Sequence, residues 1–304
     1  MVSFYKSINY ITFITNINSP KANVMCPNTN SLLSDFEKKL RLQRYAPSSI
    51  KTYKNALAKF LVAFHQYDLE QINVQQIQNF MHHLQAQHGI SAVYQKQILA
   101  SITKFYLLYY NRKLNLSALY PKRKSKPLPK YLTVREVKRL LLQCTNRKHL
   151  CILKILYGCG LRVSEVIGLK IADIDSSSMR LVVRAAKGNK DRVLPLPQTL
   201  LHNLRQYYVA YRPKVYLFEG QYGGRYTSKS IQSFIKKYAR EANIQKSVTP
   251  HILRHSYATH QLENGVNIRY VQELLGHSSI KTTERYTHVT KVSKNKITNP
   301  LDHL

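Results

Sequence analysis

The hydrophobic residues between positions 31 and 112 recur every three or four residues, which is the period of amphipathic helices. Ser31 can cap a first helix that runs to about Arg44, and Pro47 suits the first turn of a second helix. That second helix carries one apolar stripe, made of Ile50, Tyr53, Leu57, Phe60, Leu61 and Phe64. The same period continues over 74–84 and 92–109, with a stop near Gly89. The pattern predicts a small four-helix module.

The pattern changes at Pro121–Lys130, a basic segment interrupted by prolines that we interpret as a linker. Beyond it, Thr133 and Glu136 have the spacing of a capping box, and helical periods extend to about position 169. Two short β-type runs, 180–184 and 192–196, flank the turn Lys187-Gly-Asn-Lys190 and predict a hairpin. Helical patterns return at about 198–211, 228–242, 250–264, 268–275 and 279–286.

These elements predict a mainly α-helical protein with a small β-hairpin or sheet. Its length of 304 residues agrees with two domains. We expect residues 1–28 to form a disordered extension, 29–116 a helical domain, 117–130 the basic linker, 131–290 a mixed α/β domain and 291–304 a tail.

The chain has 47 Lys and Arg residues against 15 Asp and Glu residues, a formal net charge of +32. A compact protein tolerates this excess best when its partner is a polyanion, so nucleic acid is our first interpretation and an anionic membrane surface the second. The sequence has no stretch of 18 apolar residues that could span a membrane, and its N-terminus lacks a signal-peptide cleavage site. We therefore expect a cytoplasmic protein.

The four cysteines show neither a paired nor a metal-binding spacing. Three of them lie in apolar, helix-like surroundings that favour buried free thiols: Cys144, Cys151 and Cys159. The sequence lacks the phosphate-binding loop of ATP-driven motors, and its acidic residues are too scattered for a two-metal nuclease. If the protein cleaves nucleic acid, we expect it to need no ATP, metal or other cofactor.

The residues that can do chemistry lie near predicted helix ends and turns. His251 and Arg254 share one face of a first helical turn, where free backbone N–H groups and the helix dipole favour an anion. Taken singly, each candidate also has an ordinary explanation, such as a capped helix end, a helix salt bridge or an exposed lysine. The remaining candidates are Arg162, Glu165, Lys187, His277 and Tyr286.

Taken together and in order, four segments resemble the tyrosine recombinases of the phage-integrase family: GCGLRVSEV, AAKGNKDRVLPL, HILRHSYATHQLENGVNIRYVQELLGHSSIKTT and ERYTHV. The residues of these segments are most similar to those of the Xer-type and transposon-borne members, and the match extends over about 130–290. The helical module at 31–112 stands where that family has its core-binding, SAM-like domain. One departure is that the turn reads Ala-Lys-Gly where the family often has Gly-Lys-Gly.

The resemblance implies a role for each candidate in the mixed domain, which would be the catalytic domain. Tyr286 would attack a backbone phosphate and form a 3′-phosphotyrosyl link. Arg162 and Arg254 would bind the two non-bridging phosphate oxygens, where charge builds in the transition state. Lys187 would protonate the departing 5′ oxygen.

The resemblance also implies catalytic roles for two histidines and a supporting role for one carboxylate. His251 and His277 would assist proton transfer and hydrogen-bond the phosphate, and Glu165 would orient active-site side chains. The implied function is site-specific recombination of double-stranded DNA on paired inverted half-sites, through a Holliday junction. The implied assembly is a homotetramer or paired heterotetramer in which the 291–304 tail docks on a neighbouring protomer.

Two other functions are compatible with the same residues. A type IB topoisomerase-like relaxase would share the chemistry but cut one strand of one duplex, and a DNA-binding accessory protein would keep the fold without the activity. The sequence carries no information on the target site, because phosphate contacts do not read bases. It is equally silent on accessory factors and on whether the protein resolves chromosome dimers or moves a mobile element.

Overall fold

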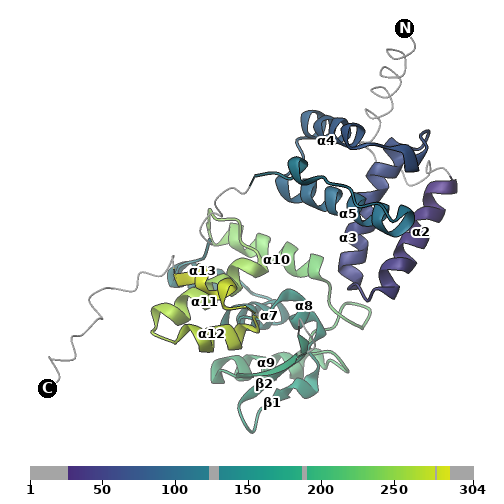
Figure 1. The fold of residues 1–304 in the computed structure, drawn as a ribbon. Helices are drawn as coiled ribbons and strands as arrows, with labels where there is room; N and C mark the ends of the chain where they lie inside the picture. The colour runs from purple at the N-terminus through teal and green to yellow at the C-terminus, as the bar shows by residue number, and fades with distance from the viewer. Residues whose placement is uncertain (1–26, 123–129, 187–189, 278, 288–304) are drawn as a thin grey trace, which may run out of the picture. The chain divides into compact units, whose positions relative to one another are not determined.

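The computed structural model describes residues 27–122, 130–186, 190–277 and 279–287 of the chain (Figure 1). The chain divides into two compact units, Met1–Ser125 and Lys126–Leu304, and each has its own hydrophobic core. The predicted tail at 291–304, most of the predicted extension and half of the predicted linker lie outside the described residues. None of the helices within the described ranges is long and apolar enough to cross a membrane.

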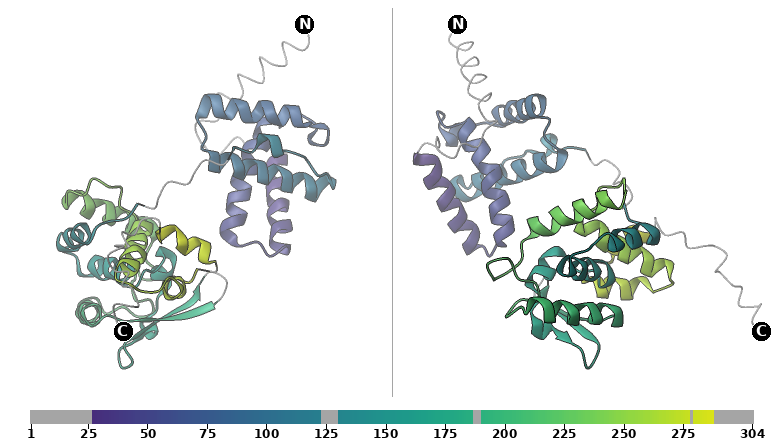
Figure 2. Two further views of the ribbon diagram at one scale, coloured as in Figure 1. Left: turned by 60° about the vertical axis from the view of Figure 1, so that its left-hand side comes forward. Right: turned by 180° about the vertical axis from the view of Figure 1, so that it is seen from behind.

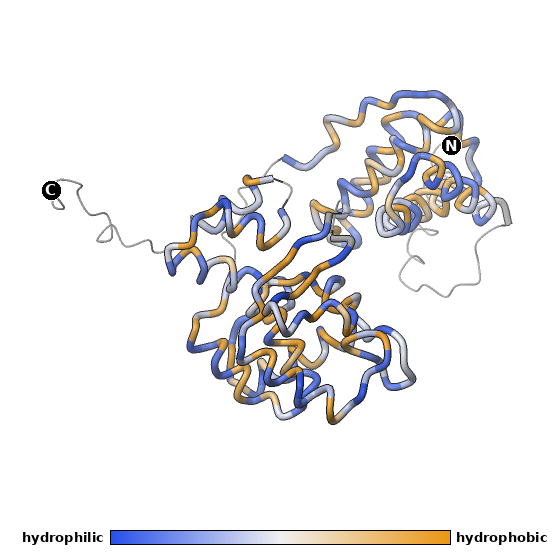
Figure 3. The backbone as a smooth tube through the Cα atoms, turned by 90° about the horizontal axis from the view of Figure 1, so that it is seen from below, coloured by the Kyte–Doolittle hydropathy of each residue, from blue (hydrophilic) through white to orange (hydrophobic). Residues whose placement is uncertain are grey.

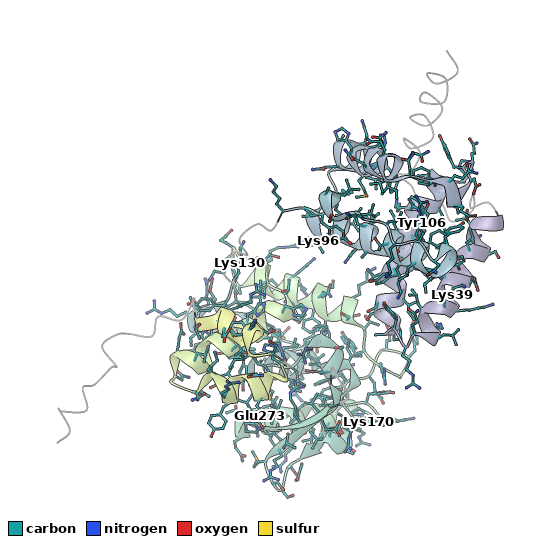
Figure 4. The ribbon with its side chains drawn as sticks, viewed as in Figure 1. Lys39, Lys96, Tyr106, Lys130, Lys170 and Glu273 are labelled. Carbon is teal, nitrogen blue, oxygen red and sulfur yellow. The ribbon has the colours of Figure 1, made fainter. Side chains whose placement is uncertain are left out.

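The first unit contains four α-helices within residues 27–122: α2 (Pro27–Leu42), α3 (Pro47–Ala63), α4 (Val74–His88) and α5 (Ala92–Tyr110). Short 3-10 turns follow α3 at Leu69–Gln71 and α5 at Ser117–Leu119. The apolar stripe predicted on the second helix faces the core, where Leu57 and Phe60 are fully buried. Tyr106 of α5, which is labelled in Figure 4, is also fully buried, and its hydroxyl donates to Leu69 O at 2.6 Å.

The ends of these helices follow local capping chemistry. The prediction that Ser31 caps the first helix is wrong, because α2 begins earlier, at Pro27. A proline suits the first turn, since its fixed φ is helical and the N–H that it lacks would have no helical partner. Pro47 opens α3 as predicted, and Gly89 ends α4 with a left-handed φ of 52°.

The second unit combines helices with a small sheet that lies at one edge of the unit (Figure 2). Its elements before the last strand are α6 (Val134–Leu142), α7 (Arg147–Gly158), α8 (Val163–Gly168), a 3-10 turn (Ile171–Asp173), β1 (Ile174–Asp175) and β2 (Arg180–Ala186). They are followed by β3 (Lys190–Pro195), α9 (Gln198–Tyr211), α10 (Ser228–Glu241), α11 (Pro250–Glu263), α12 (Ile268–Leu275) and α13 (Ile280–Thr287). The predicted capping box of Thr133 and Glu136 is present at the start of α6.

The sheet has three antiparallel strands in the order β1-β2-β3. The sequence pattern misses β1, because a strand of two residues leaves no periodic signal. In the predicted hairpin, Leu181 pairs with Leu194 and Val183 pairs with Arg192. Since side chains alternate between the faces of a strand, Arg192 shares the buried face of Leu194 and points into the unit, with 9% of its side chain exposed.

Hydrophobic and hydrophilic stretches alternate along the chain in both units, as amphipathic elements require (Figure 3). The large core of the second unit includes all three cysteines predicted to be buried thiols, which are free. A smaller cluster joins α11, α12 and α13, and its buried members are Tyr257, Ala258, Leu262, Val271, Leu275 and Tyr286. Because the cluster includes Tyr286, the position of this candidate nucleophile depends on core packing.

Gly160 occupies a position in the second unit that tolerates no side chain. Its φ is +62°, and a Cβ atom there would lie 2.8 Å from Tyr257 Cε1 and 3.1 Å from Leu275 Cδ2. The close approach of the 160 backbone to α11 and α12 therefore requires glycine.

We expect Gly160→Ala to destabilise the second unit by roughly 2–5 kcal/mol, because about 1–2 kcal/mol of left-handed strain adds to about 1–3 kcal/mol of overpacking. Gly265→Ala is the matched control, since Gly265 has a φ of +87° but no atom within 4 Å of its Cβ position. The control should lose only the strain contribution. Urea unfolding of the two variants measures the difference, and equal losses would contradict the packing argument.

Candidate active site

Three consecutive carbonyl groups at the C-terminal end of α12 each accept a hydrogen bond from a different arginine. The bonds run from Arg192 Nε to Leu274 O (2.9 Å), from Arg254 Nη2 to Leu275 O (2.5 Å) and from Arg162 Nη2 to Gly276 O (3.1 Å). The last carbonyls of a helix lack intrahelical partners and carry the negative end of its dipole. The end of α12 therefore brings together cations from the start of α8, from β3 and from α11.

Glu165 lies between two of these arginines. Its Oε1 accepts from Arg162 Nη1 at 2.7 Å, and its two carboxylate oxygens accept from Arg192 Nη1 and Nη2 at 2.9 and 2.8 Å. Only 6% of the Glu165 side chain is exposed. Burial alone would raise the pKa of this carboxyl, but the hydrogen bonds from Arg192 and from the backbone and side chain of Arg162 lower it to about 2. The carboxylate is therefore ionised at neutral pH and holds both guanidinium groups in place.

The positions of Arg162 and Glu165 follow from the way that α8 begins. Arg162 is the residue before the first helical turn, and its backbone N–H donates to Glu165 Oε2 at 2.8 Å. The spacing of three residues brings their side chains onto one face, as the sequence predicts for a salt bridge. The same carboxylate thus caps α8 and pairs with Arg162.

Arg254 is almost fully buried, with 3% exposed, on the first turns of α11. Besides its bond to the end of α12, its Nη1 donates to Gly160 O at 2.5 Å. Burial and the charges of Arg162 and Arg192 lower the pKa of this guanidinium to about 10, so it still carries its positive charge at neutral pH. A guanidinium has five N–H donors, so two carbonyl bonds leave donors for an oxyanion.

Tyr286 on α13 lies beside this arginine cluster and is 2% exposed. Its hydroxyl is 2.7 Å from Nδ1 of His255, the residue that follows Arg254 on α11. Burial raises the pKa of the Tyr286 phenol, while the charges of Arg254, Arg285 and Arg162 oppose that rise. The phenol is therefore protonated at neutral pH.

His277 is a second histidine close to the Tyr286 ring. The two rings are nearly parallel, at 16° with their centroids 6.4 Å apart, and His277 Nδ1 is 2.9 Å from Thr283 Oγ1. Burial and the charges of Arg254 and Arg162 lower the pKa of His277 to about 3. His277 is therefore a neutral hydrogen-bonding group in this state. It directly follows Gly276, which ends α12 with a φ of 62°, as predicted for a helix-capping glycine.

The described part of the chain thus brings together five of the seven residues predicted for the site, namely Arg162, Glu165, Arg254, His277 and Tyr286. His251 lies one turn before His255 on α11, is exposed, and has its ring centroid 6.5 Å from that of His255. Lys187 lies outside the described residues.

The sequence analysis did not single out Arg192 or His255, and both are central to the geometry. The signal for Arg192 was its position two residues before Leu194 on a strand, which turns a charged side chain inward. The signal for His255 was its spacing of four residues from His251, which places both imidazoles on one side of α11.

Chemically, this arrangement can bind a phosphate ester and present a nucleophile to it. Preorganised guanidinium groups stabilise charge on non-bridging oxygens, and a tyrosine hydroxyl beside them can attack phosphorus. Within the described residues, no group of three or more His, Cys, Asp or Glu side chains has the geometry to hold a metal ion.

Comparison with known proteins identifies the family. Residues 130–292 match the phage integrase family, and residues 32–116 match the phage integrase N-terminal SAM-like domain. Tyrosine recombinase XerD from Oceanobacillus iheyensis is 36% identical over 281 residues, covering 85% of this chain and 94% of the relative. Tyrosine recombinase XerA from Pyrococcus horikoshii is 45% identical over 169 residues, covering 54% of this chain and 59% of the relative.

The fold is shared with a solved structure. The XerH site-specific recombinase, bound to its difH substrate in a pre-cleavage complex, superposes with a TM-score of 0.69 at 22% identity, over 84% of this chain and 82% of that chain. These matches confirm the resemblance stated from the sequence motifs: the chain belongs to the phage integrase family, the tyrosine recombinases.

Proposed function

We propose that Tyr286 is the nucleophile with which this tyrosine recombinase cuts and rejoins DNA strands at specific sites. The observation that carries the proposal is the position of the Tyr286 hydroxyl, next to the cluster of arginines gathered at the end of α12. Attack on a backbone phosphate forms a 3′-phosphotyrosyl link and releases a 5′ hydroxyl. A second 5′ hydroxyl reverses the reaction, so the energy of the phosphodiester is retained without ATP.

In this mechanism, Arg162 and Arg254 bind the non-bridging oxygens of the scissile phosphate. Charge on these oxygens increases in the pentacoordinate transition state, and a fork of N–H donors fits two oxygens better than an ammonium group does. Glu165 acts through Arg162 by fixing its orientation. His251 and His277 hydrogen-bond the phosphate and assist proton transfer, and Lys187 protonates the departing 5′ oxygen.

For the assembly, we propose a tetramer on double-stranded DNA that carries paired inverted half-sites, with the 291–304 tail docking on a neighbouring protomer. The net charge of +32 supports a DNA partner, since each neutralised phosphate releases counterions. Similarity to a recombinase solved on its DNA substrate supports the same partner. We also propose a cytoplasmic location, which agrees with a DNA partner.

We expect Tyr286→Phe to abolish the covalent protein–DNA adduct on a nicked suicide substrate, because the variant lacks the attacking oxygen. DNA affinity should remain within a few-fold, since no charge changes. Gel electrophoresis after denaturation measures the adduct, and filter binding or fluorescence anisotropy measures the affinity. Tyr222→Phe is the control, because Tyr222 is 96% exposed. Persistent adduct in Tyr286→Phe would show that another residue is the nucleophile.

We expect Glu165→Gln to destabilise the protein at pH 7 by about 3–5 kcal/mol, the usual loss when one partner of a buried ion pair is removed. In the folded protein the pKa of Glu165 is about 2, below its ordinary value of 4.5. The ionised carboxylate therefore contributes fully to the free energy of unfolding above pH 4.5, and this contribution is lost as the pH falls toward 2. The difference between wild type and variant should therefore shrink over that range.

Chemical denaturation at several pH values measures this difference. Glu241→Gln is the matched control, because Glu241 forms an i,i+4 pair with Lys237 at 3.9 Å and is 42% exposed. Its effect should stay below about 1 kcal/mol. If the difference in stability between wild type and Glu165→Gln did not change between pH 5 and pH 2, the expected pH dependence would be wrong.

We expect Lys187→Ala to slow cleavage roughly 10²–10⁴-fold, the usual contribution of a positioned proton donor. Sulfur in place of the 5′ bridging oxygen should restore the cleavage rate of Lys187→Ala, since a thiolate departs without a proton. Arg162→Ala should gain much less from sulfur, and Lys190→Ala should be affected only mildly on either substrate. Rescue of Lys190→Ala instead would transfer the role to Lys190, and rescue of neither would place the acid elsewhere.

A further inference from the structure

The Tyr286 hydroxyl has a hydrogen-bond partner that the assigned roles do not use. His255 Nδ1 lies 2.7 Å from Tyr286 Oη, and the ring centroids are 5.4 Å apart at an angle of 55°. Both side chains belong to the protein interior: Tyr286 is 2% exposed, and His255 is half-buried between α11 and α13. The pair is therefore held by packing rather than by a chance contact of mobile side chains.

The proton of this hydrogen bond belongs to the tyrosine. Burial, followed by the charges of His251, Arg285 and Arg254, lowers the pKa of His255 to about 4, so the ring is neutral at neutral pH. Burial raises the pKa of Tyr286, so the phenol keeps its proton. A buried hydroxyl needs an acceptor, and a neutral imidazole that carries its proton on Nε2 offers the Nδ1 lone pair 2.7 Å away. In this tautomer Tyr286 donates to His255.

From this geometry we propose that His255 is a catalytic residue that accepts the phenolic proton when Tyr286 attacks the phosphate. The inference rests on the proposed role of Tyr286 as nucleophile. In cleavage, the Oη–H bond breaks as the Oη–P bond forms, and the proton moves to Nδ1 and makes an imidazolium. In rejoining, the imidazolium returns this proton to Tyr286 as the phosphotyrosyl bond breaks, so protons balance over the cycle.

The neighbouring imidazoles are less suited to this step. His277 Nδ1 is already hydrogen-bonded to Thr283 Oγ1, and the His277 ring lies nearly parallel to the Tyr286 ring, so its in-plane lone pairs do not aim at the hydroxyl. His251 is exposed and lies a helical turn away, with its ring centroid 6.5 Å from that of His255. His255 is the one of the three whose ring nitrogen is hydrogen-bonded to Tyr286 Oη within the described residues.

Substrate binding strengthens this base. The positive groups that disfavour an imidazolium at His255 include Arg254, which binds a phosphate oxygen in the proposed function. A bound phosphate brings negative charge to that guanidinium and offsets its effect on the imidazole. The proton acceptor is therefore weak in the free protein and stronger when the scissile phosphate is in place.

The test compares His255→Asn and His255→Ala with wild type in single-turnover cleavage of a nicked suicide substrate. The asparagine amide oxygen can accept the tyrosine hydrogen bond but cannot take its proton at neutral pH. We expect both variants to lose roughly 10²–10⁴-fold in cleavage rate. His260→Asn is the matched control, since His260 is a buried histidine of α11 whose Nδ1 lies 3.0 Å from Tyr157 Oη, and it should stay within a few-fold of wild type.

A second substrate separates proton transfer from a merely structural effect. A DNA strand ending in a 3′-p-nitrophenyl phosphate can be joined to a 5′ hydroxyl without Tyr286, because nitrophenolate leaves without a proton. Each His255 variant, combined with Tyr286→Phe, should join this strand within a few-fold of the rate of Tyr286→Phe alone, which also shows that the site is folded. Sulfur at the 5′ bridging position should not restore cleavage by the His255 variants. A thiolate leaves without a proton donor, but Tyr286 must still lose its proton to a base.

Three results would overturn the proposal: cleavage by either variant near the wild-type rate, equal losses in cleavage and in nitrophenyl-ester joining, or rescue of cleavage by the bridging sulfur. Tyr286→Phe in the same assays keeps this failure distinct from that of the proposed function. If Tyr286→Phe still forms adduct, the assignment of the nucleophile is wrong. If it forms none while His255→Asn cleaves normally, only the role of His255 is wrong.

Discussion

The candidate active site depends on the end of one short helix. α12 ends in three carbonyl groups that face three guanidinium groups, and this contact gathers the N-terminus of α8, strand β3 and helix α11 around one point. Cations packed this closely repel one another, so the site needs fixed negative partners to exist without substrate. The carboxylate of Glu165 and the helix dipole supply that compensation, and both belong to the protein itself.

The excess of positive charge also determines the state of the neighbouring imidazoles. His255 and His277 have pKa values lowered to about 4 and about 3, first by burial and then by charges that include Arg254. In the free protein the site therefore presents charged arginines and neutral histidines. This division suits phosphoryl transfer, because the arginines bind charge while the histidines remain available to hydrogen-bond or to accept protons.

The sequence predicts most helices well, because their signals are local. The ranges 198–211 and 268–275 match α9 and α12, and the capping box at Thr133 opens α6 as expected. The failures have equally physical causes: Ser31 is overridden by the proline before it, and β1 is too short to show a period. The sequence analysis did not single out Arg192 and His255, because the residues that they contact are distant in the sequence. Nothing local distinguishes one arginine among 47 basic residues as the one whose guanidinium reaches the end of α12.

Since the three anchors at the end of α12 are backbone carbonyls, their placement is encoded by the length and phase of the helix rather than by the side chains at 274–276. Side-chain substitutions that preserve the packing of Leu275 leave the carbonyls where they are. Inserting or deleting one residue within α12, by contrast, would turn its end by about 100° and direct the carbonyls away from the arginines. The site therefore tolerates substitutions in α12 better than insertions or deletions in it.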